Sequence, residues 1–130
     1  MTHRPKVLIV EDDHSARVEL GDVLRDAGYL VLEAPGGEAA LRLAVSGDPA
    51  VILLDLILPD GAGFDLLDRL RHLPSGERIS IVAVSGFEER IRDAKLAGAR
   101  FDAYLLKPFG IAQLLAAVAD TLTARRAVEA

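Results

Sequence analysis

Residues 7–13 read VLIVEDD, an unbroken apolar run that is followed directly by three acidic residues. An apolar run of this length is typical of a β-strand that is buried on both faces, as in a parallel sheet. The acidic residues then mark the carboxyl end of the strand. A similar pattern returns at residues 51–55, VILLD, where a second apolar run ends at Asp55. The sequence thus predicts two buried strands with acidic carboxyl ends.

The rest of the chain alternates short β-prone runs with stretches in which apolar residues recur at helical spacing. Gly28 and Gly98 are expected to end two of the helices, because glycine favours the backbone conformation that follows a helix. The patterns predict strands at about 7–10, 29–33, 51–54, 79–84 and 103–106, and helices at about 15–27, 36–46, 64–70, 88–97 and 111–122.

Strands that alternate with helices at this spacing require right-handed crossovers and a mainly parallel sheet covered on both faces. We therefore expect an α/β three-layer sandwich of five strands and five helices. No linker or composition shift divides the chain, so we expect one domain over residues 1–130, with a core at about 6–123 and no output domain. The tail after Thr123, which includes Arg125 and Arg126, is expected to be loosely held.

Composition narrows the class of protein. The chain has 130 residues, of which 51% are hydrophobic and 27% charged, as in an ordinary globular domain. It has no cysteine, which excludes disulfides and thiolate metal sites and favours a reducing cytoplasm. The net charge of −5 argues against binding to nucleic acid or anionic membranes. The apolar runs are only long enough for strands, and the polar start does not resemble a signal peptide.

Polar residues follow the strands at the edge where ligands of open α/β sheets bind. Glu11, Asp12 and Asp13 follow the first strand, Asp55 ends the third, and Ser85 and Lys107 follow the fourth and fifth. Taken singly, each has an ordinary explanation: Asp12 or Asp13 as a helix cap, Ser85 as a cap, Asp55 and Lys107 as loop residues. Together, crowded carboxylates repel one another and favour a compensating cation.

Lys107 supplies one positive charge, and a divalent metal would supply more. A set of oxygen ligands without cysteine favours Mg²⁺ that keeps several waters over Zn²⁺ or a caged Ca²⁺. A hard cation beside a free carboxylate and a lysine suggests phosphoryl transfer, in which a carboxylate attacks in line to form an aspartyl phosphate.

Four segments then identify a family: VLIVEDD, LLDLILPDG, VAVSG and YLLKPF. Over about residues 6–123 the chain resembles the receiver domain of two-component response regulators. The resemblance implies a flavodoxin-like, doubly wound parallel sheet with strand order 2-1-3-4-5.

The resemblance also implies roles for individual residues. Asp55 is the phosphoacceptor, and Mg²⁺, with Mn²⁺ as an alternative, is held by Glu11, Asp12, Asp55 and the backbone carbonyl of Ile57. Asp12 is implied to bind the metal directly and Glu11 through a coordinated water.

Further positions match the phosphoryl-binding and switch residues of the family. Ser85 and Lys107 contact the phosphoryl group, and the peptide between Lys107 and Pro108 is expected to be cis. Asp13 is expected to cap the first helix. On phosphorylation, the hydroxyl of Ser85 moves toward the phosphoryl group and the ring of Tyr104 turns inward behind it.

This family likeness implies a phosphorylation-activated signalling switch. A sensor histidine kinase or a histidine phosphotransfer protein would phosphorylate Asp55, which would change the face made by the fourth helix, the fifth strand and the final helix. A downstream protein would bind that face, without direct contact to nucleic acid or membrane, and phosphorylation-linked homodimerisation stays open. The chain is expected to catalyse only its own phosphorylation and dephosphorylation, and not to be an enzyme that acts on other substrates.

The sequence departs from the family pattern at two places. Ala62 stands where a polar residue is commoner, and the segment 98–104 is about two residues longer than usual. Ile57 and Phe87 are apolar at positions that tune access of water, which predicts a long-lived phosphorylated form. His14 is expected to face solvent rather than to sense pH.

Two alternatives stay in view. A phosphatase of the haloacid-dehalogenase kind needs a second acid two residues after the nucleophile, and Ile57 stands there. An adaptor with a receiver fold would keep these residues without using them. Nucleotide binding is disfavoured, because acidic residues follow the first strand where a phosphate cradle needs glycines.

Overall fold

A computed structural model of the chain describes residues 4–58 and 61–129. The strands are β1 Lys6–Val10, β2 Leu30–Ala34, β3 Val51–Asp55, β4 Ile57–Leu58, β5 Gly61–Ala62, β6 Ser80–Ser85 and β7 Ala103–Leu106. The helices are α1 His14–Asp26, α2 Gly37–Ser46, α3 Gly63–Arg71, α4 Glu88–Leu96 and α5 Ile111–Glu129. The expected strands and helices are therefore present, with small differences in their bounds.

The main sheet has five parallel strands in the order β2-β1-β3-β6-β7. This order matches the expected 2-1-3-4-5 once β4 and β5 are set aside, because these two pair only with each other. The sequence analysis predicted no strand between residues 54 and 79 and so missed this antiparallel hairpin. Pro59 and Asp60 lie outside the described residues.

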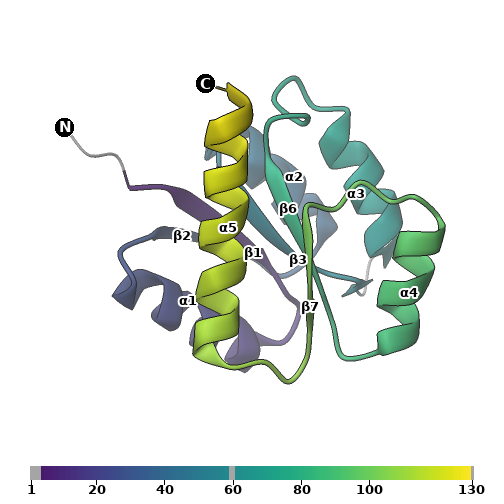
Figure 1. Cartoon of the computed structure of the whole chain (residues 1–130), viewed down its shortest axis with the longest axis horizontal. Coiled ribbons are helices and arrows are strands. Elements are labelled where there is room, and N and C mark those ends of the chain that lie inside the picture. Colours follow the sequence, from purple (N-terminus) through teal and green to yellow (C-terminus); the bar gives the residue numbers. More distant parts are fainter. Residues whose placement is uncertain (1–3, 59–60, 130) are drawn as a thin grey trace.

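The core has two halves, one on each face of the sheet. Alternate residues of β1 point to opposite faces, so Val7 and Ile9 join one cluster while Leu8 and Val10 join the other. Leu24 of α1 and Leu114 of α5 cover the first face. The second face is covered by α2 and α3, and α4 packs against β6 and β7 (Figure 1). These layers form the expected three-layer sandwich.

The helix boundaries have local causes that the sequence analysis predicted. The carboxylate of Asp13 accepts a hydrogen bond of 2.8 Å from the backbone N–H of Ala16 and so caps α1. Gly28 and Gly98 have φ angles of 99° and 70° after α1 and α4, a conformation that glycine adopts without strain.

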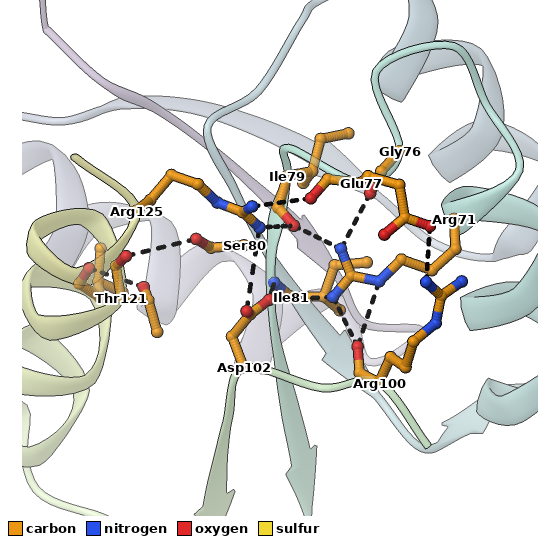
Figure 2. A network of polar contacts seen from close by, with 11 residues as sticks. Arg71, Gly76, Glu77, Ile79, Ser80, Ile81, Arg100, Asp102, Thr121 and Arg125 are labelled. Carbon is orange, nitrogen blue, oxygen red and sulfur yellow. Dashed lines mark hydrogen bonds and ion pairs between the residues drawn. The ribbon is translucent and has the colours of Figure 1, made fainter. Parts of the chain in front are cut away.

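A polar network fixes the amino-terminal edge of the sheet (Figure 2). Arg71, at the end of α3, is buried and donates hydrogen bonds to the carbonyls of Gly76, Ile79 and Arg100. It also pairs with Asp102 at 3.0 Å, and the same carboxylate oxygen accepts a hydrogen bond of 2.7 Å from the backbone N–H of Ile81. We call the side chains of Arg71, Asp102 and Arg125 the amino-edge network.

The expectation of a loosely held tail after Thr123 is wrong for Arg125. α5 continues to Glu129, and the guanidinium of Arg125 donates to the carbonyls of Glu77 at 2.7 Å and Ile79 at 2.9 Å. A third contact joins Arg125 and Asp102 at 3.9 Å. The partners lie more than 20 residues away in sequence, so local patterns gave no sign of them.

Candidate functional site

The polar residues predicted at the strand ends meet at the carboxyl edge of the main sheet. Glu11 directly follows β1, Asp55 ends β3, Ser85 ends β6 and Lys107 directly follows β7 (Figure 1). Strand order reverses between β1 and β3, because the chain runs from β1 outward to β2 and then returns to the other side of β1. Ligands of doubly wound sheets bind at such a reversal. Glu11 and Asp55 flank it.

Three carboxylates come together at this reversal. Glu11, Asp12 and Asp55 each offer an oxygen, and these oxygens lie within 4.8 Å of one another. Glu11 and Asp55 are buried, with 4% and 9% of their surface exposed, whereas Asp12 is exposed. Carboxylate oxygens suit hard cations such as Mg²⁺. With Lys107, these residues form what we call the carboxyl-edge cluster.

Lys107 joins two of these carboxylates. Its ammonium Nζ donates to Glu11 Oε1 at 2.7 Å and to Asp55 Oδ2 at 3.2 Å. Burial acts to lower the pKa of Lys107, but the hydrogen bond to Glu11 and the charges of Asp55 and Glu11 outweigh burial and raise the pKa above 10.5. The lysine therefore stays charged. As expected, the peptide between Lys107 and Pro108 is cis.

One backbone N–H and one lysine side chain fix the carboxylate of Asp55. The N–H of Ile57 donates to Asp55 Oδ1 at 2.9 Å, while Lys107 holds Oδ2. The N–H of Leu56 also binds the carbonyl of Val84 at 3.0 Å, which ties the segment after β3 to β6. The sequence analysis assigned Ile57 a role through its carbonyl, and a contact through its N–H could not be predicted from residue types.

Ser85 lies at the same edge, with its hydroxyl turned to the start of α4. The Oγ of Ser85 accepts a hydrogen bond of 3.1 Å from the N–H of Phe87, the residue that precedes α4. The side chain of Phe87 is 55% exposed and that of Ile57 is 42% exposed. Both apolar residues thus reach the surface at this end of the sheet.

Tyr104 lies farther from the cluster, on the edge strand β7. Its ring is partly buried, and burial raises its pKa above 10.0. Lys95 of α4 and Phe101 contact the ring. His14 is exposed, as expected, and its Nδ1 lies 3.2 Å from Arg17.

Arg17 supports the site but was missed in the sequence analysis. It donates to the backbone carbonyl of Glu11 at 2.8 Å and pairs with Glu33 at 3.3 Å. Its side chain is only 13% exposed. The sequence offered one clue to this role, a charged residue in the first helical turn after the acidic run. Its partner Glu33 lies on β2, and the sequence pattern did not predict that β2 and Arg17 are close in space.

Comparison with known proteins places this geometry in a family. The family model described as the response regulator receiver domain matches residues 7–119. The chain belongs to this family. It is 38% identical over 124 residues to the transcriptional regulatory protein CusR of Escherichia coli K12. The aligned residues make up 95% of this chain and 53% of CusR. It is 29% identical over 119 residues to the chemotaxis protein CheY of Halobacterium salinarum, covering 92% of this chain and 98% of that protein.

Solved structures agree with this assignment. A CheY-like receiver domain from Methylobacillus flagellatus aligns with a TM-score of 0.83 at 33% identity, covering 92% of this chain and 99% of that one. The receiver domain described here thus has the fold and the sequence pattern of two-component response regulators. It spans about half the length of CusR. None of the helices among the described residues is long and apolar enough to cross a membrane.

Proposed function

We propose that this receiver domain is a phosphorylation-activated switch in which Asp55 accepts a phosphoryl group from a sensor histidine kinase or a histidine phosphotransfer protein. One observation carries the proposal: the buried carboxylate of Asp55 lies among the oxygens of Glu11 and Asp12 and 3.2 Å from the ammonium of Lys107. In the transfer, a carboxylate oxygen of Asp55 attacks phosphorus as the P–N bond of the donor phosphohistidine breaks. The electron pair stays on the imidazole nitrogen.

The chain's own residues provide position and charge for this step. The N–H of Ile57 and the ammonium of Lys107 hold the two oxygens of Asp55, so the nucleophile is oriented before the donor arrives. Lys107 lies beside the carboxylate and would pair with the charge of the transferred group. The hydroxyl of Ser85 would leave Phe87 to bind a phosphoryl oxygen.

The donor set fits Mg²⁺, with Mn²⁺ as an alternative. Asp12 and Asp55, with the carbonyl of Ile57, would hold the ion directly, and the exposure of Asp12 leaves it accessible. Glu11 already binds Lys107 at 2.7 Å, which supports its acting through a coordinated water. When bound, the metal supplies positive charge that stabilises the oxygens of the transferring phosphoryl group.

Phosphorylation would change the face formed by α4, β7 and α5, where a downstream protein would bind. Leu96, Leu106 and Ile111 are large apolar side chains exposed on these three elements. The phosphoryl group adds about −1.5 to −2 charges and three acceptors, which favour any arrangement that brings Ser85 and Lys107 closer. We propose that the chain catalyses no reaction beyond its own phosphorylation and dephosphorylation.

Incubation with Mg²⁺ and acetyl phosphate, read by intact mass, tests the function. We expect the mass gain of one phosphoryl group, lost in Asp55→Asn and on addition of a chelator. Asp13→Asn is the matched control, because the carboxylate of Asp13 caps α1 and asparagine also caps helices. A mass gain that persists in Asp55→Asn would contradict the proposal. A phosphorylated protein with unchanged partner affinity would favour an adaptor.

A further inference from the structure

The ring of Tyr104 is held between two side chains from outside the carboxyl-edge cluster. The ammonium Nζ of Lys95 lies 4.9 Å from the ring centroid. Phe101 meets the ring edge-on, with centroids 5.7 Å apart and an interplanar angle of 65°. Phe101 also packs against one of the two core clusters, so its position is fixed. The Tyr104 ring is therefore in contact with the Phe101 ring, which comes from the segment before β7, and with the ammonium of Lys95 from α4.

The ring of Tyr104 is the main contact of the Lys95 ammonium. It lies in the last turn of α4 and is exposed. Among residues 4–58 and 65–125, whose side chains the structure describes, no carboxylate pairs with its ammonium within 4.0 Å. A lysine over an aromatic face is attracted by the negative charge density of the ring. The Tyr104 ring is thus the partner that orients Lys95.

Ser85 and Tyr104, the two switch residues that the family resemblance implies, contact the chain at the two ends of α4. The Ser85 hydroxyl accepts from the N–H of Phe87 just before the helix begins, and Lys95 in the last turn covers Tyr104. A movement of Ser85 toward Asp55 breaks the first contact. A movement of the Tyr104 ring breaks the second. Lys95 therefore opposes the second movement.

We propose that Lys95 is a positioning residue that holds the Tyr104 ring against α4 and so sets how readily the domain switches. This inference rests on the proposed function. A cation over an aromatic ring at an exposed site stabilises the arrangement enough to change a two-state equilibrium about two- to fivefold. Since coupling between two sites is reciprocal, loss of Lys95 should favour modification at Asp55 by up to the same factor.

Tyr104 can be observed alone, because the chain has two tyrosines and no tryptophan. In a Tyr29→Phe background, 3-fluorotyrosine gives one ¹⁹F resonance, from Tyr104. During a titration with beryllofluoride in the presence of Mg²⁺, this resonance reports the position of the ring, and its change with concentration gives the half-saturating beryllofluoride concentration. The variants are Lys95→Gln, the conservative Lys95→Arg, and Arg92→Gln, an exposed cation one turn earlier on α4 that loses the same charge.

We expect Lys95→Gln to shift the resonance of the free protein toward its beryllofluoride position and to lower the half-saturating beryllofluoride concentration about two- to fivefold. Lys95→Arg should restore both values, and Arg92→Gln should leave both unchanged. Equal effects of Lys95→Gln and Arg92→Gln, or a higher half-saturating concentration in Lys95→Gln, would overturn the role of Lys95. A parent protein that does not respond to beryllofluoride would overturn the proposed function instead.

Discussion

The two edges of the sheet both carry charged side chains, but the charges are balanced at one edge and not at the other. At the amino edge, Arg71 directs its donors to three backbone carbonyls and to Asp102, so its charge is neutralised by groups of the fold itself. At the carboxyl edge, three carboxylates face the single ammonium of Lys107. Three negative charges against one positive charge leave the cluster with an excess of two.

This difference separates a structural polar network from a binding site. Buried polar groups that find partners within the fold stabilise one arrangement, as in the amino-edge network. An uncompensated group of carboxylates lowers stability until a cation binds. Variants at the two edges should therefore have different effects. Changes at the amino edge should lower the free energy of unfolding, whereas changes at the carboxyl edge should alter binding with little loss of stability.

The largest effect on stability is expected for Arg71→Met. This change removes the Arg71 donors from the carbonyls of Gly76 and Arg100 and leaves Arg125 as the only guanidinium partner of the Ile79 carbonyl and Asp102. We therefore expect the free energy of unfolding to fall by about 2–4 kcal/mol. Urea denaturation measures it. The control is Arg100→Gln, because the side chain of Arg100 forms an exposed ion pair with Glu77 at 2.6 Å that should contribute at most about 1 kcal/mol. Similar losses in the two variants would contradict the structural role of the amino-edge network.

Addition of Mg²⁺ should have the next largest effect and should act only through the carboxyl edge. At a Mg²⁺ concentration one hundred times its dissociation constant, the free energy of unfolding should rise by about 2.7 kcal/mol. Asp12→Asn should weaken Mg²⁺ binding about tenfold or more, a loss of about 1.4 kcal/mol, as measured by isothermal titration calorimetry. Asp13→Asn should bind Mg²⁺ like the parent. If Asp12→Asn also binds normally, the cluster does not hold the ion as proposed.

A smaller effect, of opposite sign to that of Arg71→Met, is expected for Asp55→Asn without added metal. Removal of one of three crowded carboxylates should leave the stability unchanged or raise it by up to about 1 kcal/mol, since the neutral amide oxygen can still accept from Ile57 and Lys107 keeps its bond to Glu11. Thermal unfolding in the presence of a chelator measures this. A marked loss of stability would show that Asp55 serves the fold as Arg71 does.

The smallest effect concerns Tyr104 and alkaline pH. Burial raises its pKa, so the folded protein keeps the phenol proton at pH values where the unfolded chain releases it. The contribution of Tyr104 to stability is therefore complete below about pH 10 and is lost as the pH rises through the raised value. Absorbance titration in a Tyr29→Phe background should give a midpoint above 10.0. A midpoint at or below that value would show that the ring is not protected by its contacts.

Much of the carboxyl-edge cluster could be predicted from the sequence because each residue ends a strand or follows one within two residues. The apolar runs fixed the strands, and parallel strands bring their carboxyl ends to one edge. Asp55 and Lys107 are 52 residues apart, yet their strand positions alone predicted that they would meet. The amino-edge network had no such guide, because Arg71 and Arg125 lie on helices and reach carbonyls of loops.

The alternation of strands and helices, the fold class, and the acidic and basic residues at one edge can all be predicted from the order of residues, because periodicity and strand ends are local properties of the chain. The pairing of side chains came from the folded structure: Glu11 with Lys107, Ser85 with Phe87, Tyr104 with Lys95, and Arg125 with Ile79 just before β6. These contacts depend on side-chain rotamers and on how helices lie over the sheet. Packing sets both, and the pattern of residue types does not specify them.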